Sequence, residues 1–320
     1  MSIKKALLTL TILSTCLAGC SSNQTSKQEN TALEIQSIPE NYKSPATHSG
    51  ELVQLDYTTY ESLSYESHDK TLQKSAYVYL PYQYDPHQSY NIFYLMHGGW
   101  SNETTVLGTS SQPTELKYAI DHAIEDGLMD PLIIVCPTYN NENPDDSDNY
   151  SLALTLTDNY HNELVNDLIP AVEGKYSTYA KDTTPEGLRQ SRDHRGFGGF
   201  SMGSVATWHT FEYCLDYFRY FMPMSGSLTS DGDYMTSIVE NAGYSWNDFF
   251  IFAFSGTDDF AYQSFTSQIE AMKNADNNIF RFANDETKGN LNYLIKEGAS
   301  HDAKASHEYT YNCLLWFWNH

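Results

Sequence analysis

Basic side chains are scarce in this sequence of 320 residues. Lysine and arginine together number 18, whereas aspartate and glutamate number 41, so the formal net charge is −23 at pH 7. Proteins that bind nucleic acids use clustered lysine and arginine to neutralise phosphates, and this composition argues against that class. A hydrophobic fraction of 40% with 14% aromatic residues is too high for a disordered acidic chain, so a folded domain is expected.

Cysteine is also rare, with five in the whole chain. Beyond Cys20 the thiols are Cys136, Cys214 and Cys313, which lie far apart in the sequence. This spacing is typical neither of a disulfide-rich domain nor of a Cys/His zinc site. We therefore expect no metal site and buried free thiols, with one disulfide as the alternative.

Long hydrophobic runs are missing, apart from a short one at the N-terminus. Lys4 and Lys5 precede an apolar stretch over residues 6–15, which is too short to span a bilayer and is typical of a secretory signal. Residues 17–20 (Leu-Ala-Gly-Cys) resemble the bacterial lipobox, in which the cysteine is lipidated and becomes the mature N-terminus. The resemblance predicts a lipid anchor at Cys20 and an extracytoplasmic lipoprotein, at the cell surface or the periplasmic face. An ordinary signal peptide with an unrelated cysteine is the alternative.

The sequence predicts three parts: a lipoprotein signal peptide at residues 1–19, a flexible tether at 20–49 and one catalytic domain at 50–320. The tether begins with residues 21–30, which have almost no apolar side chains and cannot offset the entropy cost of ordering. Neither an internal repeat nor a change of composition divides the remainder.

Segments with strand and helix patterns alternate along the domain. Strands are expected at residues 52–58, 75–80, 91–96, 132–136, 195–200, 220–224, 249–254 and 292–296. Helices are expected at residues 114–126, 158–176, 202–218, 234–241, 263–274 and 303–318, with a polar loop at 140–150. Strands separated by helices form βαβ units, so the pattern predicts an α/β fold with a mostly parallel central sheet and helices on both faces.

The clearest chemical motif is Gly-Phe-Ser-Met-Gly at residues 199–203, which matches G-x-S-x-G. In this motif a serine sits on a sharp turn between a strand and a helix, and glycines avoid clashes around it. An apolar, glycine-rich strand is expected before Ser201 and a helix after it, as the motif requires. The pattern predicts Ser201 as a nucleophile.

A serine nucleophile needs a base and a carboxylate that orients the base. His301 follows the last predicted strand and precedes the last helix, and such a loop reaches the carboxyl edge of a parallel sheet, where active sites lie. His307, inside that helix, is the weaker candidate. Asp258 and Asp259 follow another apolar strand, and the spacing leaves the choice between these two carboxylates open. The order Ser, Asp, His is that of α/β-hydrolases.

An oxyanion hole requires backbone N–H groups next to the nucleophile. Met202, directly after Ser201, would supply one of them. The second would come from the His-Gly-Gly-Trp segment at residues 97–100, which follows a predicted strand and resembles the HGG(G) loop of esterases. Either Gly99 or Trp100 could donate it. His97 would stabilise the loop.

These motifs together resemble the esterase group of α/β-hydrolases that contains bacterial feruloyl esterases, acetylxylan esterases and mycolyltransferases. The feruloyl esterase domains are the most similar, on the segments at residues 90–99, 164–170, 198–203 and 220–226, and the resemblance covers residues 50–320. In that group the catalytic acid is the last residue of a Gly-Thr-(Asp/Glu)-Asp stretch, which selects Asp259. Asp302 stands where the family often has tryptophan.

The resemblance implies a serine esterase that releases ferulic acid from plant cell-wall xylan through a Ser201–His301–Asp259 triad, without any cofactor. Its partners would be feruloylated or acetylated plant polysaccharides or oligosaccharides. An acetylxylan esterase, another small-ester esterase or an acyltransferase on the same triad remains an alternative. A glycan-binding surface lipoprotein without catalysis is an alternative of another class. Tyrosine, with 25 residues, is unusually frequent, and several tyrosines are expected around the Ser201 cleft.

Overall fold

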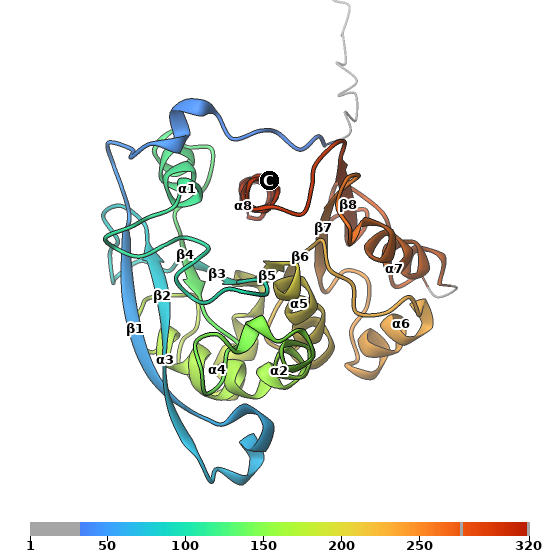
Figure 1. The fold of residues 1–320 in the computed structure, drawn as a ribbon, viewed down its shortest axis with the longest axis horizontal. Helices are drawn as coiled ribbons and strands as arrows, with labels where there is room; N and C mark the ends of the chain where they lie inside the picture. The colour runs from blue at the N-terminus through green and yellow to red at the C-terminus, as the bar shows by residue number, and fades with distance from the viewer. Residues whose placement is uncertain (1–32, 276–277, 319–320) are drawn as a thin grey trace, which may run out of the picture. The chain divides into compact units, whose positions relative to one another are not determined.

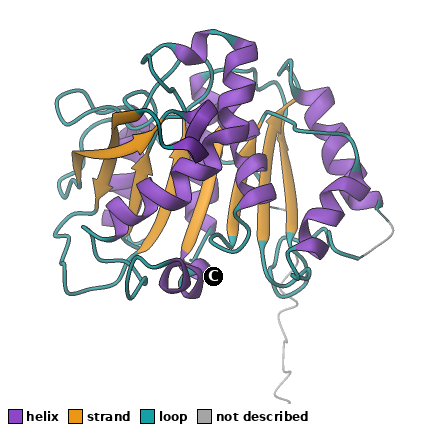
Figure 2. Cartoon of the chain, turned by 90° about the horizontal axis from the view of Figure 1, so that it is seen from below, coloured by secondary structure: helices purple, strands orange, loops and turns teal. Residues whose placement is uncertain are grey.

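The computed structural model describes residues 33–275 and 278–318, which lie in one compact unit, Leu33–His320. In the described residues an eight-stranded sheet has the order β1-β2-β4-β3-β5-β6-β7-β8. The strands are β1 (Glu51–Tyr60), β2 (Thr71–Leu80), β3 (Asn91–Met96), β4 (Leu132–Cys136), β5 (Arg195–Phe200), β6 (Tyr220–Met224), β7 (Phe250–Gly256) and β8 (Leu291–Lys296). Figure 2 shows them side by side between the helices.

Most of the sheet is parallel, as expected. Strands β4, β3, β5, β6, β7 and β8 run in one direction, whereas β2 is antiparallel to both β1 and β4. Strands β4 and β7 are buried along their whole length, because helices cover both faces of a parallel sheet. The alternating residues of β3 enter two cores: Ile92 and Tyr94 belong to one, and Phe93 and Leu95 to the other.

The helices are α1 (Glu115–Glu125), α2 (Tyr150–Glu163), α3 (Ile169–Glu173), α4 (Pro185–Gln190), α5 (Met202–Tyr213), α6 (Gly232–Asn241), α7 (Tyr262–Asn274) and α8 (Ala303–Trp316). Short helical segments lie at η1 (Glu40–Lys43), η2 (Ser62–Ser67), η3 (Asp146–Asp148), η5 (Arg192–His194) and, as a π-helix between α2 and α3, η4 (Leu164–Leu168). Helices α1 and α8 cover one face of the sheet, and α2 and α5 the other (Figure 1). This is the predicted three-layer arrangement.

Two helix boundaries differ most from the prediction, and α4 was not predicted. Helix α2 begins at Tyr150 instead of residue 158, because the Asn149 side chain accepts a hydrogen bond from the Leu152 N–H and caps the helix inside the polar segment. Helix α5 ends at Tyr213 instead of residue 218, because Cys214 leaves the helical conformation (φ −125°, ψ 23°) as the chain turns back toward β6.

The tether predicted for residues 20–49 is too long at its C-terminal end. From Leu33 onward the chain packs on the domain: the Gln36 N–H donates to the Asn312 side chain, and Tyr42 is buried in the core beneath α1 and α8. Tyr42 supplies the apolar surface that offsets the ordering entropy, which the polar composition further upstream does not offer. The signal peptide, Cys20 and residues 20–32 lie outside the described residues.

Many tyrosine side chains hydrogen-bond to the abundant carboxylates. In several pairs a buried tyrosine donates its hydroxyl to a carboxylate: Tyr57 to Glu163, Tyr79 to Asp121 and Tyr94 to Glu173, where the carboxylate is buried too, and Tyr42 to Asp126 and Tyr65 to Asp167, where it is not. A carboxylate that accepts hydrogen bonds tolerates burial far better than one that does not. Much of the tyrosine content therefore stabilises the fold.

The three cysteines of the domain are free and buried, as expected. Burial raises the pKa of the Cys136 thiol to about 12, so this side chain is an inert apolar group at neutral pH. Within residues 33–275 and 278–318, every helix is too short or too polar to cross a membrane.

Candidate active site

Ser201 occupies a strained turn between β5 and α5. Its backbone dihedrals are φ 61° and ψ −118°, a region that residues with a Cβ atom rarely adopt. The Ser201 N–H donates to the Met224 carbonyl at 2.9 Å, which fixes the turn against the end of β6. The structure thus has the strand–turn–helix geometry that the Gly-x-Ser-x-Gly motif predicts.

The two motif glycines are required by close backbone contacts. A Cβ atom on Gly199 would lie 2.6 Å from the Met96 carbonyl oxygen, and one on Gly203 would lie 2.5 Å from the same atom. The Gly203 position would also meet the His97 carbonyl oxygen at 2.7 Å. Both glycines therefore let the serine turn pack directly on the end of β3, which leads into the predicted oxyanion loop.

His301 lies on the loop between β8 and α8. Its Nδ1 atom is 2.8 Å and 2.9 Å from the two carboxylate oxygens of Asp259. An ionised carboxylate only accepts hydrogen bonds, so Nδ1 carries the proton and Nε2 is left as a base. The imidazole packs against the rings of Phe200 and Phe260, with centroid distances of 4.4 Å and 4.1 Å.

The structure distinguishes the two candidate aspartates. Asp259 is buried behind His301, whereas Asp258 is exposed. Burial by itself raises the pKa of Asp259, but hydrogen bonds from His301, the Ala261 N–H and Ser225 outweigh it, and the pKa of the carboxyl lies below its usual value. Asp259 is therefore ionised at neutral pH and can stabilise a protonated His301.

The loops that carry the acid and the base are joined to each other. The Asp258 N–H donates to the Ala299 carbonyl at 3.1 Å, and the Gly298 N–H donates to the Thr257 hydroxyl at 2.8 Å. A Cβ atom on Gly256 would lie 2.2 Å from the Ala299 carbonyl oxygen. Only a glycine at position 256 allows this approach, which sets the distance between Asp259 and His301.

The predicted oxyanion loop follows β3. Met202 is the first residue of α5, where backbone N–H groups have no partner within the helix. The Trp100 N–H already donates to the Ser147 carbonyl at 3.2 Å, with Trp100 in the left-handed region (φ 53°). Of the two residues that the sequence offered as second donor, the geometry favours Gly99.

His97 supports this loop from inside. Its Nδ1 lies 2.7 Å from the Gly98 carbonyl, which can only accept, so Nδ1 is protonated and Nε2 accepts from the Thr138 hydroxyl at 2.7 Å. Burial lowers the pKa of His97 to about 4, so the ring is neutral near pH 7. The Tyr139 hydroxyl donates to the same Gly98 carbonyl at 2.9 Å.

Ser201 stands where two cavities of about 320 Å³ each meet. His301 and His307 line the first cavity, together with Ser306. The second cavity lies toward α2 and α5; its walls include Tyr150, Met202, Val205, Ser225 and Ser227. Trp100 and Phe260, residues that are 70% and 82% exposed, line both cavities.

Sequence reasoning missed several residues of this site. Phe260 could have been found because it follows Asp259 directly, but Tyr150 and Ser147 lie in or next to a polar loop that carries no motif. The expectation of several tyrosines around the Ser201 cleft is wrong, since Tyr150 is the one tyrosine among the described residues that line the two cavities. Most other tyrosines are used in the core.

A mostly parallel sheet with helices on both faces, a serine on a strained turn between β5 and α5, and an aspartate–histidine pair on the loops after β7 and β8 define the α/β-hydrolase class. A family model described as "Putative esterase" matches residues 71–316. The chain belongs to this esterase family.

Two relatives are similar over most of the chain. An endo-1,4-β-xylanase Y of Acetivibrio thermocellus is 40% identical over 294 residues, which is 90% of this chain and 25% of that protein. The chain thus spans a quarter of the length of this curated relative. A serine-to-alanine mutant of the feruloyl esterase module from Clostridium thermocellum, complexed with sinapinate, is 39% identical. It matches with a TM-score of 0.78 over 90% of this chain and 95% of the module.

A more distant structure has the same fold. The ferulic acid esterase from the anaerobic fungus Anaeromyces mucronatus, in complex with ferulic acid, is 19% identical with a TM-score of 0.63. The match covers 89% of this chain and 97% of the fungal chain.

Proposed function

We propose that the protein is a carboxylic ester hydrolase that releases hydroxycinnamic acids such as ferulic acid from plant xylan. One observation carries this proposal. Ser201, on its strained turn, lines the same cavity as His301, and His301 is hydrogen-bonded to Asp259. The similarity to a feruloyl esterase module and to a xylanase over 90% of this chain supports the substrate class.

The mechanism is acyl transfer through a covalent serine intermediate. His301 Nε2 takes the proton of Ser201 as its oxygen attacks the ester carbonyl, and Asp259 stabilises the resulting imidazolium. The N–H groups of Met202 and Gly99 stabilise the oxyanion. His301 then gives its proton to the departing sugar oxygen, and a water molecule, activated by His301 in turn, releases the acid from Ser201.

The direction of this proton transfer indicates which cavity binds the alcohol and which binds the acyl group. The sugar oxygen must leave on the side of His301, so the first cavity takes the alcohol and the second cavity takes the acyl group. Trp100 and Phe260, exposed at both cavities, offer apolar faces to an aromatic acid.

The cavity assignment is tested by filling each cavity separately. Val205→Phe narrows the second cavity, and we expect kcat/KM for methyl ferulate to fall at least about tenfold while p-nitrophenyl acetate, with its small acyl group, is hydrolysed almost normally. Ser306→Leu, in the first cavity, is the matched control and should leave methyl ferulate hydrolysis nearly unchanged. The opposite pattern would reverse the assignment.

The substrate class is tested with methyl ferulate, acetylated xylan and p-nitrophenyl acetate, with and without an added alcohol acceptor. We expect methyl ferulate to give the highest kcat/KM. Preference for acetylated xylan would indicate an acetylxylan esterase, and ester formation with the added alcohol would indicate an acyltransferase. Xylan binding without any ester hydrolysis would indicate a glycan-binding protein.

We also propose that a lipid on Cys20 anchors the enzyme to a membrane outside the cytoplasm. The support is the sequence at residues 17–20, which lies outside the described residues. Cys20→Ser should move the protein from the detergent phase to the aqueous phase in a Triton X-114 partition, whereas Cys16→Ser, in the signal segment, should not. Equal partition of the wild type and Cys20→Ser would contradict the anchor.

A further inference from the structure

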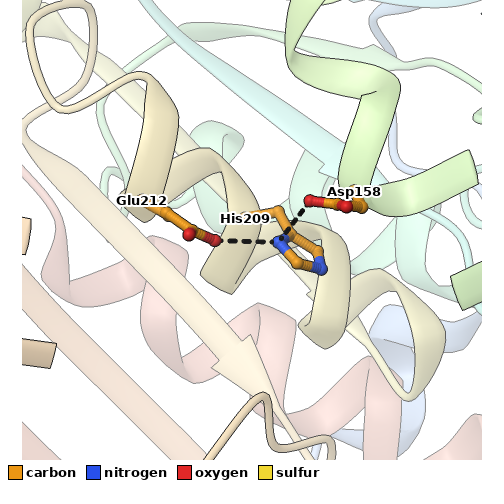
Figure 3. A group of neighbouring side chains, drawn as sticks. All are labelled: Asp158, His209 and Glu212. Atoms are coloured by element: carbon orange, nitrogen blue, oxygen red, sulfur yellow. Dashed lines mark hydrogen bonds and ion pairs between the residues drawn. The ribbon is translucent and has the colours of Figure 1, made fainter. Parts of the chain in front are cut away.

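Three side chains with metal-binding atoms converge on the outer side of α2 and α5, away from the triad. Asp158 comes from α2, and His209 and Glu212 come from α5, one helical turn apart. Figure 3 shows the Nδ1 atom of His209 between the two carboxylates, at 3.4 Å from Asp158 Oδ1 and 3.0 Å from Glu212 Oε2. Donor atoms of all three residues lie within 4.8 Å of one another.

These separations also suit a tetrahedral metal ion. One proton on Nδ1 accounts for the hydrogen bond to Glu212 at 3.0 Å, whereas Asp158 Oδ1 lies 3.4 Å from the same nitrogen and accepts from the Tyr213 hydroxyl instead. Zinc binds imidazole nitrogen and carboxylate oxygen at about 2.0–2.2 Å, which places neighbouring tetrahedral ligands about 3.3–3.6 Å apart. The observed distances from Nδ1 need to change by only a few tenths of an ångström to reach that geometry.

Two tyrosines orient the carboxylates toward this point. The Tyr213 hydroxyl donates to Asp158 Oδ1 at 2.9 Å, and the Tyr234 hydroxyl donates to Glu212 Oε1. The oxygen of Glu212 that faces His209 therefore stays available. Hydrogen bonds of this kind fix metal-binding side chains and raise the affinity of a site.

The burial and charge of the three groups favour a cation. His209 is 91% buried, so its ring has little freedom, whereas the Asp158 side chain is half-exposed and leaves a path from solvent.

We propose that Asp158, His209 and Glu212 form a zinc site, with water as the fourth ligand. Imidazole nitrogen with two carboxylate oxygens is a donor set that zinc accepts, whereas calcium prefers oxygen alone. His209 lies about 12 Å along α5 from Ser201 at 1.5 Å per residue, so the ion takes no part in ester hydrolysis. The zinc ion would link α2 to α5. Helix α2 carries Tyr150 of the second cavity, and α5 begins directly after Ser201.

The spacing of cysteines and histidines along the sequence predicts no metal site. Here a pair at i and i+3 on one helix is completed by a residue of another helix far upstream, which only the packing of α2 on α5 brings close. The proposal therefore replaces that expectation for these three residues.

The test is zinc binding by the chelator-treated full domain, measured by calorimetry with zinc sulfate and by the melting temperature. Asp158→Asn is the main variant, since the position is half-exposed and an asparagine oxygen can still accept from Tyr213. We expect the wild type to bind one zinc ion that Asp158→Asn binds at least about tenfold more weakly. The rise in melting temperature with zinc should shrink in parallel.

Two further variants make the test decisive. Glu212→Gln removes a second ligand and should weaken the same ion. His122→Asn removes a histidine that also has a glutamate three residues later, in α1, and should leave zinc binding unchanged, which controls for unspecific binding to surface histidines. Zinc affinity and stoichiometry that are the same in the wild type, Asp158→Asn and Glu212→Gln would overturn the proposal. Absence of any binding to the wild type at submillimolar zinc would also overturn it.

Discussion

His301 Nδ1 lies almost equally far from the two carboxylate oxygens of Asp259, at 2.8 Å and 2.9 Å. The contact fixes the tautomer in which Nε2 is unprotonated, and it places a negative charge beside the ring that must accept a proton from Ser201. The neighbouring Asp258 is exposed and makes no contribution of this kind, so adjacent residues of the same type have different roles.

This difference predicts unequal effects of two similar substitutions. Asp259→Asn leaves the shape intact but favours the wrong tautomer of His301, and we expect kcat for methyl ferulate to fall by about 10⁴. Asp258→Asn should retain nearly full activity, since that side chain faces solvent. Initial rates of both purified variants check the prediction, and equal losses would contradict the assignment of Asp259.

The strained serine predicts a gain in stability from an inactivating substitution. With φ at 61°, the backbone of Ser201 is strained because of its Cβ atom. Glycine has no Cβ atom and relieves this strain, whereas alanine keeps it. We expect Ser201→Gly to exceed Ser201→Ala in free energy of unfolding by about 1 kcal/mol. Urea denaturation of both variants measures the difference, and a less stable glycine variant would contradict the strain.

Because the pKa of His97 is low, we expect the protein to lose stability in mild acid. Burial lowers its pKa from 6.5 to about 4, so between these values the unfolded chain binds a proton that the folded chain does not. The free energy of unfolding should therefore decrease as the pH falls through this window, with up to about 1.4 kcal/mol per pH unit from this group.

The contribution of His97 is isolated by comparing variants. His97→Gln cannot titrate, so its unfolding free energy should depend less steeply on pH between about 6.5 and 4 than that of the wild type. His87→Gln, at an exposed position, controls for the loss of a histidine as such. Parallel pH profiles for the wild type and His97→Gln would contradict the assignment.

A buried ion pair at the first residue of β5 is expected to contribute strongly to stability. Arg195 Nε and Nη2 donate to the two oxygens of Glu173 at 2.6 Å and 2.9 Å, and both side chains are almost fully buried. Arg195→Met leaves the Glu173 charge without its partner, which should cost about 3–5 kcal/mol.

An exposed pair provides the control for this prediction. Arg189 lies 3.6 Å from Asp216, with both side chains nearly half-exposed, so Arg189→Met should cost less than about 1 kcal/mol. Thermal and urea unfolding of the two variants measure both values. Similar costs for Arg189→Met and Arg195→Met would contradict the role of the buried pair.

The central part of the fold follows directly from sequence patterns. Continuous apolar runs such as residues 91–96 and 132–136 predict buried parallel strands, and these boundaries agree with β3 and β4. Ser201 and His301 were found because glycine spacing and a position after a strand are local signals.

Other features depend on contacts between distant segments. The N–H of Trp100 is occupied by Ser147, whose position in a polar loop gives no sign of this contact. Asp259 could be chosen over Asp258 only from a family pattern, because burial behind His301 is a tertiary property. The start of α2 at Tyr150 depends on a single capping side chain, Asn149, within a segment whose composition is typical of a loop.

The hydrolysis of methyl ferulate by Ser201→Ala tests the central claim most directly. The variant keeps the backbone turn and the His301–Asp259 pair, so it should fold, with a melting temperature close to that of the wild type. We predict that its kcat falls at least about a thousandfold. Wild-type rates of ferulate release by the folded Ser201→Ala protein would contradict a serine esterase mechanism.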